Sequence, residues 1–370
     1  MAAVREPWRR LVAEVRQPEF FQLHGWHEAY LRCLEDSPDD FVILELGRDG
    51  AVTGFLPLRL GPADFLGLRL AVLALPSHNQ APLAGIVLRD SEVLSDYLAA
   101  MAIATAAAGV RWDAMRLGRV PAGSPGLDGM GPSGSALPSL RIWRARFNVV
   151  PCAQPFESIA AGWSKNFRGN LRKARNKLQA AGTVGYVTTS EHADFETCLS
   201  QFLEVEASGW KGGQGRGSAI ALDPRRAEFY RSLGSRMEPE GVCEINLLLL
   251  DDRCIAGQFC LRCGGTVNVL KIGYSEDHAR LAPGNMLMER LLARAAGTPE
   301  VQRVSFVSDS DWHRDWRPES TDVFDLWIFN RTARGIVARA FMSSREGAKR
   351  AYRHLRRLRG SASSPRGGRA

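Results

Sequence analysis

Apolar and polar positions along the chain predict one hairpin motif that occurs twice. Residues 43–61 and 247–264 both read as two apolar runs separated by a short charged turn, which is typical of a β-hairpin. Because self-similarity at a distance indicates repeated structure, we expect two domains of one architecture. Four residues coincide when the stretches are aligned: Gly54 with Gly257, Leu58 with Leu261, Arg59 with Arg262, and Gly61 with Gly264.

Further elements surround the second hairpin. Residues 164–181 carry apolar positions at helical spacing, and the other faces of this predicted helix are basic. The order of antiparallel strands followed by strand, helix and strand predicts an α+β fold whose sheet contains a parallel crossover. After the hairpin we expect a strand at 266–273, a helix at 284–296, strands at 303–308 and 323–330, and a long helix at 333–359.

Composition suggests where the domains end. The segment 121–139 is dense in glycine, proline and serine, so it is predicted to be an exposed loop. The alanine-rich stretch 97–110 is too short to cross a bilayer and is interpreted as a buried helix. We expect a first domain at 1–150, a second at 151–342, and a basic tail at 343–370 that is helical and then disordered.

The net charge of +8 comes from one end of the chain. From Arg345 to Ala370 there are nine arginines or lysines and one acidic residue, so the remainder is close to neutral. A broad surface for nucleic acid is therefore not indicated. A basic helix end of this kind either keeps the protein in solution or brings it to the inner face of an anionic membrane.

Seven cysteines at irregular spacing, in a chain that starts without an apolar signal segment, predict reduced thiols and a cytoplasmic protein. Cys260 and Cys263 form a lone CxxC motif inside a predicted strand, where residues three apart point to opposite faces. No second pair accompanies them in the sequence, so we expect no metal site.

One strand-to-helix junction contains residues suited to binding an anion. Pro283, Gly284 and Asn285 stand where the predicted helix at 284–296 begins, and its first turn has no acidic residue. A helix N-terminus presents unpaired N–H groups, and glycine lets a ligand approach the backbone. A plain turn would use the same residues, since proline is common at the first helical position. Spacing alone leaves both interpretations open.

Three stretches of the sequence carry a family resemblance: "LKIGYSEDHARLAPGNMLMERLL" (270–292), "LEVEASGWKG" (203–212) and "SKNFRGNLRKARNKL" (164–178). Together they resemble a GNAT-type acetyltransferase family associated with cellulose or exopolysaccharide biosynthesis and related to the Fem peptidyltransferases. The resemblance runs through nearly the whole chain. It implies two tandem GNAT-like domains, each with a mixed, mostly antiparallel sheet flanked by helices.

The resemblance also implies that the loop at the start of the helix holds the diphosphate of acetyl-CoA, the expected co-substrate. Met286 stands where the superfamily often has a second glycine, so the match to the family's loop is incomplete. The positions that match the loop are Arg280, Pro283, Gly284, Asn285, Met286 and Leu287.

Acyl transfer of this kind needs a base for the acceptor's proton and donors for the developing oxyanion. Glu206 and Asp309 are the candidate bases, although a helix-surface carboxylate and a loop or cap role would also explain them. Lys271 lies in an apolar strand, where an unpaired ammonium is costly to bury, and the resemblance includes a lysine there, so we expect a catalytic role in the cleft. Substrate contacts are expected from Trp210, Lys211, Asp311 and Trp316, while the tryptophans, including Trp312, would otherwise serve packing.

These observations predict an acyl-CoA-dependent N-acyltransferase that acts on an amine or hydroxyl acceptor in cell-envelope or exopolysaccharide metabolism. The first domain has no comparable loop in its segment 75–85 and is expected to shape a cleft for the small-molecule or saccharide acceptor. Two alternatives stay open. A Fem-type peptidyltransferase would hold aminoacyl-tRNA on the basic helix at 165–177, and a non-catalytic adaptor would keep the fold alone.

Overall fold

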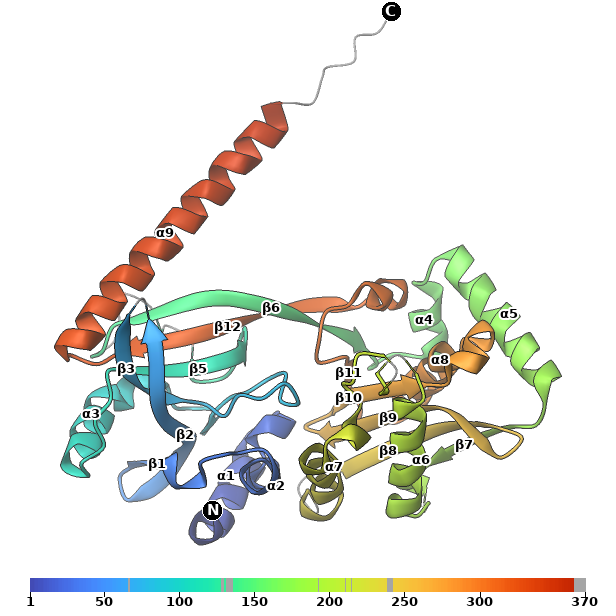
Figure 1. Cartoon of the computed structure of the whole chain (residues 1–370), viewed down its shortest axis with the longest axis horizontal. Helices are drawn as coiled ribbons and strands as arrows, with labels where there is room; N and C mark the ends of the chain where they lie inside the picture. Colours follow the sequence, from blue (N-terminus) through green and yellow to red (C-terminus); the bar gives the residue numbers. More distant parts are fainter. Residues whose placement is uncertain are drawn as a thin grey trace, which may run out of the picture.

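A computed structural model describes residues 1–65, 67–127, 130, 136–191, 193–209, 211–213, 215–237 and 242–362. Of residues 242, 350, 351 and 353–362 it describes the backbone only. The strands form one mixed, mostly antiparallel sheet with helices on both faces (Figure 1). The predicted α+β class is confirmed, with one continuous sheet in place of two separate ones.

The first half of the chain begins with two helices and then builds six strands. Its helices are α1 (Arg5–Glu14), α2 (His24–Cys33) and α3 (Leu98–Ala107). Its strands are β1 (Phe41–Arg48), β2 (Ala51–Phe65), β3 (Leu68–Ala74), β4 (Val87–Leu88), β5 (Ala114–Pro121) and β6 (Ser139–Pro151).

The second half contributes the remaining elements. Its helices are α4 (Phe156–Ala161), α5 (Lys165–Ala181), α6 (Phe195–Ala207), α7 (Pro224–Arg236), α8 (Pro283–Ala296) and α9 (Ala333–Ala362). Its strands are β7 (Val184–Thr188), β8 (Val242–Leu250), β9 (Arg253–Cys263), β10 (Thr266–Tyr274), β11 (Arg303–Ser305) and β12 (Glu319–Phe329). The order across the sheet is β1-β2-β3-β5-β12-β6-β11-β10-β9-β8-β7, and β4 pairs with β2.

The two halves repeat one topology. In each, an antiparallel hairpin is followed by a third strand, a crossover helix and a parallel strand: β1-β2-β3-α3-β5 and β8-β9-β10-α8-β11. Both hairpins turn on two residues with positive φ, Asp49-Gly50 and Asp251-Asp252, as a tight right-twisted hairpin requires. The repeated hairpin predicted from the sequence is therefore confirmed.

The aligned glycines of the hairpins allow close packing. A Cβ atom on Gly54 would lie 2.8 Å from Leu88 Cδ1, and one on Gly257 would lie 2.7 Å from Phe202 Cδ2. Both distances are shorter than a carbon–carbon contact, so any larger residue would push the neighbouring element away. The two glycines coincide in the sequence alignment because both second hairpin strands carry a closely packed neighbour, β4 at Gly54 and α6 at Gly257.

The two halves exchange one strand each. β6 follows β5 in the sequence but pairs with β11, while β12 follows β11 but pairs with β5. The exchanged strands also pair with each other, from Glu319–Val149 to Ile328–Ser139, and they span the molecule in Figure 1. At 13 residues, β6 is about 43 Å long, enough to run through both halves. This ladder makes one sheet out of the two repeats.

The exchange places the end of the chain on the first half. α9 contacts β12, β3 and β6. The boundaries expected at 150/151 and 342/343 fall inside β6 and inside α9, because both elements continue across them. The helical part of the expected tail extends to Ala362, and residues 363–370, expected to be disordered, lie outside the described residues.

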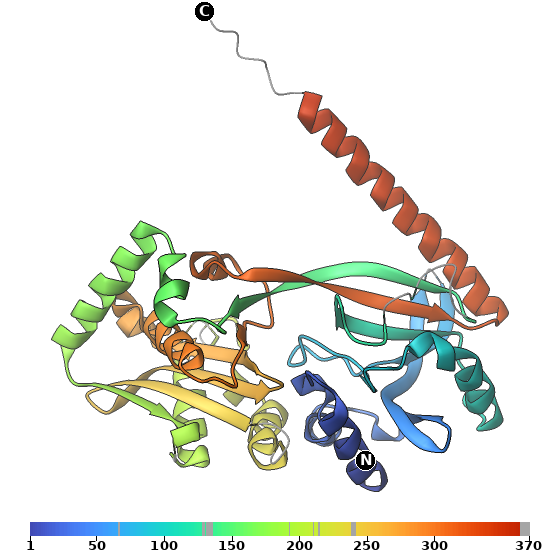
Figure 2. The same ribbon diagram turned by 180° about the vertical axis from the view of Figure 1, so that it is seen from behind.

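Apolar side chains fill both faces of the sheet. One core lies under α1, α2, α6 and α7 and includes Phe202, Phe229 and Leu247. A second core lies on the other face of the second half under α4, α5 and α8, and it includes Leu171 and Leu248 (Figure 2). Neighbouring residues of β8 enter different cores because side chains alternate along a strand.

The alanine-rich stretch forms α3 but is not a buried helix, so this interpretation was wrong. Only Leu98, Met101 and Thr105 of α3 are buried, and Ile103 is 72% exposed. Small alanine side chains let one face of α3 pack on a third core, which includes Trp112 and Leu117, while the other face meets solvent. Among the described helices, none combines the length and apolar content that a bilayer crossing requires.

We predict that the buried carboxylate of Asp325 holds the exchanged strands together. It accepts hydrogen bonds from Arg116 Nε at 3.0 Å and the Arg119 amide at 3.0 Å on β5, and from Arg144 Nε at 2.7 Å on β6. Asp325→Asn removes the charge that both guanidinium groups share, so the free energy of unfolding should fall by about 2–3 kcal/mol. Urea denaturation measures this change.

Asp322→Asn is the matched control on the same strand, because Asp322 pairs with Arg146 at the surface. It should leave the urea midpoint nearly unchanged. Equal effects of the two substitutions would contradict the special role of Asp325.

Candidate functional site

The site begins where β10 and β11 separate. The two strands run parallel for three residue pairs, ending at Asn268–Ser305. β11 stops there, whereas β10 continues along β9 to Tyr274, with a register shift that makes room for Leu270. Within the described residues no strand pairs the other edge of β10 beyond Asn268. Backbone groups on that edge need another partner, which a ligand or water can supply.

A cavity of about 300 Å³ occupies this fork. Its walls are residues 269–272 of β10 and 306–308 beyond β11, together with Asn79 and Pro82 from the first half. Val307 turns the chain away from β10 with a φ of 49°. A left-handed conformation is rare for a β-branched residue, so the chain tolerates strain at the point that opens the fork.

The start of α8 opens onto a second cavity of about 450 Å³. Ala282 precedes the helix in a left-handed conformation, and its carbonyl accepts from the amides of Asn285 at 3.0 Å and Met286 at 3.1 Å. Because Pro283 has no N–H, the Gly284 amide is the donor of the first turn that remains for a ligand. Only Tyr274 comes within 4 Å of a Cβ built on Gly284, so the described residues leave this helix end open.

A buried ion pair lies between the two cavities. Lys211 lines both, and its Nζ donates to the Ile272 carbonyl at 2.6 Å and lies 3.2 Å from Glu206 Oε1. The other carboxylate oxygen of Glu206 accepts from the Ile220 amide at 2.8 Å. Lys211 thus satisfies one backbone group of β10 and neutralises a carboxylate buried in the protein.

Lys271 faces the fork from the middle of β10. It lines the smaller cavity together with Lys211, and the described residues provide no carboxylate in ion-pair contact with it. Burial first, and then the neighbouring charge of Lys211, lower the pKa of Lys271 to about 8, although Glu206 partly offsets them. A lysine of this kind is partly neutral near physiological pH, which suits it to accept a proton.

Close approach of α6 to β10 depends on a glycine. A Cβ on Gly273 would lie 2.6 Å from Glu206 Cα, so the strand can bring its backbone against the helix only without a side chain. This contact is what carries Glu206 and, through it, Lys211 to the cavity.

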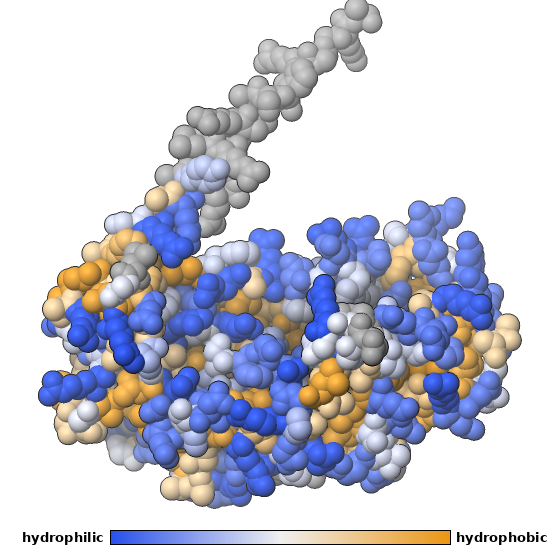
Figure 3. Space-filling view, viewed as in Figure 1, coloured by the Kyte–Doolittle hydropathy of each residue, from blue (hydrophilic) through white to orange (hydrophobic). Residues whose placement is uncertain are grey.

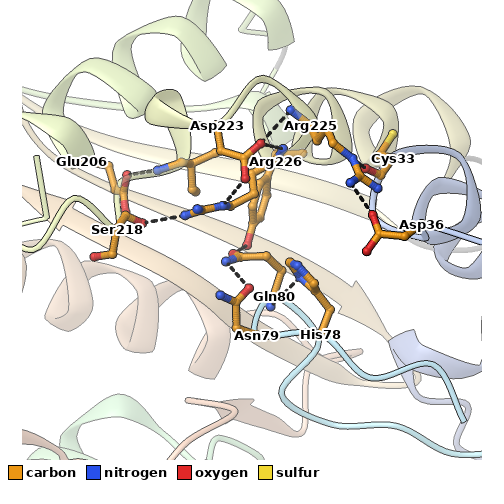
Figure 4. A network of polar contacts seen from close by, with 12 residues as sticks. Cys33, Asp36, His78, Asn79, Gln80, Glu206, Ser218, Asp223, Arg225 and Arg226 are labelled. Carbon is orange, nitrogen blue, oxygen red and sulfur yellow. Dashed lines mark hydrogen bonds and ion pairs between the residues drawn. The ribbon is translucent and has the colours of Figure 1, made fainter. Parts of the chain in front are cut away.

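The first half is tied to the site through a polar network (Figure 4). Tyr230 of α7 donates to Gln80 Oε1 at 2.8 Å, and Gln80 donates to Asn79, which lines the fork. Nearby, Arg225 of α7 lies 2.5 Å from Asp36 and donates to the Cys33 carbonyl at 2.9 Å. These contacts join α7 to α2 and to the loop after β3.

The structure brings most of the predicted residues to these cavities. Glu206 and Lys211 form the ion pair, and Lys271 lies beside them. The residues of the predicted loop that line the larger cavity are Pro283, Gly284, Asn285 and Leu287. Met286 faces the second core instead, and Arg280 is exposed on the short helix Glu276–Leu281 before α8. Trp210 lies outside the described residues.

Three expected site residues lie elsewhere. Trp316 is buried in the second core, edge-on to Trp163 and Phe167, so its role is packing and the substrate role was wrong. Asp309 is exposed, accepts from Asn148 Nδ2 at 3.0 Å and lines neither cavity. Asp311 is exposed and pairs with Arg314, one helical turn away. Asp309 and Asp311 do not line the fork although their neighbours Ser308, Ser310 and Trp312 do, and the sequence does not reveal this difference.

Sequence reasoning missed two contributors to the cavities. Gln258 is buried on β9 against the larger cavity, and its Oε1 has no partner in the described residues. His313 lines the fork, where its Nδ1 accepts from the Ser310 amide at 3.2 Å, and burial lowers its pKa to about 4. Trp312, mentioned only as one of several tryptophans, lines both cavities. A polar residue inside an apolar strand was the one available signal for Gln258.

The cysteines are free thiols. Cys260 lies in one core and Cys263 in the other, as expected for residues three apart on a strand. In the described part of the chain, no group of three or more histidine, cysteine or acidic side chains is arranged to hold a metal ion.

Comparison with known proteins places this site in a GNAT acetyltransferase domain. The family described as "Acetyltransferase (GNAT) domain" matches residues 165–314, which include α5, α6, α8 and both cavity walls of the second half. No curated protein sequence matches the chain. Residues 165–314 are therefore similar to a GNAT acetyltransferase domain.

Solved structures show the same fold over most of the chain. FemX is similar with a TM-score of 0.57 and 13% identity, over 87% of this chain and 95% of that one. The C-terminal domain of a putative lysylphosphatidylglycerol synthetase from Agrobacterium fabrum has a TM-score of 0.53, 11% identity and coverage of 91% and 94%. L-PGS from Bacillus licheniformis has a TM-score of 0.52, 12% identity and coverage of 89% and 93%. At these identities the likeness shows the fold alone.

We predict opposite effects of alanine at two site glycines. Gly273→Ala forces Cβ into the α6 backbone, which should lower the free energy of unfolding by about 1–3 kcal/mol. Gly284→Ala meets no atom closer than 3.7 Å and replaces glycine in a helix, so it should be neutral or stabilising by up to about 1 kcal/mol. Thermal unfolding of the two variants checks the geometry; a stable Gly273→Ala protein would contradict it.

Proposed function

We propose that the protein transfers an acyl group from coenzyme A to an amine on a saccharide or cell-envelope precursor. Acetyl is the acyl group that we propose first. The observation that supports this most is the open start of α8. Its glycine amide, an unobstructed cavity and the partial positive charge of the helix end together suit a diphosphate.

The two cavities together offer space for the rest of the coenzyme. From the α8 start, the larger cavity passes Gly273 and Ile272, and the smaller one continues along β10 to Val269. An extended pantetheine chain carries amide groups that can pair with the free edge of β10. In this arrangement the thioester reaches the bulge near Leu270, where backbone N–H groups can stabilise an oxyanion.

Lys271 is the residue that we assign to proton transfer. The acceptor nitrogen attacks the thioester carbonyl carbon, a C–N bond forms and the C–S bond breaks. Neutral Lys271 takes the proton from the nitrogen, and the resulting ammonium returns a proton to the departing thiolate. Glu206 is less suited as the base because Lys211 and the Ile220 amide already engage its two oxygens. It acts as the positioning residue for Lys211.

A third cavity lies between the two halves, and we propose it as the entry route for the acceptor. It has a volume of about 790 Å³ and is lined by the exchanged strands, residues 85–86 and the segment 121–125. Its polar groups include Arg16, Asp90 and the ion pair of Glu19 with Arg303. Polar edges beside apolar walls are the ordinary composition of a site for a small polar molecule. The cell-envelope or exopolysaccharide role rests on the family resemblance and belongs to the proposal.

The Gly284→Asp substitution distinguishes an effect on helix stability from an effect on coenzyme binding. A carboxylate at a helix N-terminus stabilises the helix by about 0.3–1 kcal/mol, but here it would repel the diphosphate. We expect acetyl-CoA to raise the melting temperature of the wild type and of Gly284→Ala, and to leave that of Gly284→Asp unchanged. An equal shift in all three proteins would show that the coenzyme binds elsewhere.

The pH dependence of kcat/KM tests whether Lys271 is the base. A base acts when deprotonated, so kcat/KM for acetyl-CoA turnover should rise with pH through about 8, the pKa that burial gives Lys271, and then level off. The acceptor is the best substrate from a screen of amines and amino sugars. Lys271→Met should lose about a hundredfold in kcat and flatten the profile.

Lys271→Arg is the control for charge, because arginine keeps a cation in the fork and does not release its proton. It should be as inactive as Lys271→Met. An active arginine variant with the wild-type profile would assign the base to another group.

A second candidate function is aminoacyl transfer from tRNA. The observation that favours it is α5, whose six basic residues include Lys165, Arg168 and Arg172, all exposed, with no acidic residue. One of the six, Arg175, pairs with Glu289 of α8. Salt-sensitive binding of tRNA without stabilisation by acetyl-CoA would select this function over the first. Stabilisation by neither ligand would favour a non-catalytic adaptor.

A further inference from the structure

α9 is attached to the protein by one end. Ala338 and Met342 are buried on the first-half sheet, and Phe341 meets Phe65 of β2 edge to face. The later turns extend away from the body (Figures 1 and 2). With 30 residues the helix is about 45 Å long.

Large apolar side chains remain exposed on this helix. Ile336 and Val337 are each 58% exposed and Phe341 is 41% exposed. With 3.6 residues per turn the three lie within an arc of about 140°, roughly opposite the buried Ala338 and Met342. Figure 3 shows apolar surface gathered around the base of the helix. In the sequence, Leu355 and Leu358 fall in the same arc, although the structure describes only their backbone.

The same segment holds the positive charge of the chain. Residues 333–370 contain eleven arginines or lysines and one acidic residue, and the rest of the chain is slightly negative. Arg334, Arg339 and Arg345 are exposed beside the apolar side chains. A helix with apolar residues on one side and cations around them matches the boundary between headgroups and acyl chains of an anionic bilayer.

We infer that α9 binds the surface of a membrane that contains anionic lipids and lies in its interface, with Ile336, Val337 and Phe341 toward the acyl chains. Nucleic acid would use the arginines but would leave the apolar side chains in water. A second copy of the chain would bring two strongly cationic helices together, which charge repulsion opposes. The inference does not depend on the proposed acyl transfer, since α9 lines none of the cavities.

Sedimentation with vesicles tests the inference on the full chain. The protein should bind vesicles of phosphatidylcholine mixed with phosphatidylglycerol, release at high salt, and bind phosphatidylcholine alone far more weakly. Each exposed arginine near the surface contributes about fivefold to the binding constant, so Arg334→Gln, Arg339→Gln and Arg345→Gln together should weaken binding about a hundredfold. Absence of binding to the anionic vesicles at low salt would overturn the inference.

Two variants with unchanged charge make the test specific. Ile336→Ser with Val337→Ser removes the exposed apolar groups and should weaken vesicle binding at least tenfold. Ile103→Ser is the control, because Ile103 is an apolar residue on α3 that is even more exposed, at 72%. A membrane partner would be contradicted if all of these proteins bound the vesicles equally, or if the control lost as much binding as the double variant. It would also be contradicted by a concentration-dependent dimer that the combined Ile336→Ser and Val337→Ser substitutions dissociate. All variants should keep the melting temperature and the acetyl-CoA response of the wild type, which separates this result from the proposed function.

Discussion

The separation of β10 from β11 is the constraint on which the rest of the site depends. A parallel pair that stops at Asn268–Ser305 leaves one strand edge with unpaired backbone groups inside the protein. Such groups are costly to bury without partners, so the gap has to be filled by a ligand, water or a side chain. Lys211 satisfies one of them at Ile272, and the open start of α8 lies beside the same gap. Val307 and Ala282 both have a left-handed backbone conformation, and they lie at the two points where the gap opens.

Strand exchange explains why the first half matters to a site built by the second. Because β6 and β12 cross between the repeats, neither half has a complete sheet without the other. Asp325 fixes the crossing on one side, and the contacts of Tyr230 and Arg225 hold the first-half loop and α2 against α7 on the other. The result places Asn79 and Pro82 at the fork in a fixed position. The first repeat thereby contributes a wall to a cavity of the second.

Local signals predicted the elements well, and contacts between distant segments account for what they missed. The hairpins follow from charged turns, and α8 follows from Pro283-Gly284 and the apolar spacing after it. Lys271 was found because an unpaired ammonium is costly to bury in an apolar strand. Glu206 was one of the two candidates for the base that acyl transfer requires. Trp316 and Asp309 were misplaced because nothing local tells a core tryptophan from a binding one, or shows which residues after β11 line the fork. The exchange of β6 and β12 was invisible for the same reason: each strand reads identically whichever half it joins.

We propose that the Gly284 amide and the fork between β10 and β11 hold an acyl-coenzyme A. A crystal structure of the wild-type protein grown with acetyl-CoA measures this most directly. We expect diphosphate density within hydrogen-bonding distance of the Gly284 amide and a thioester between Leu270 and Val307. Coenzyme bound outside these cavities, or a fork filled by the protein's own side chains under saturating acetyl-CoA, would contradict it.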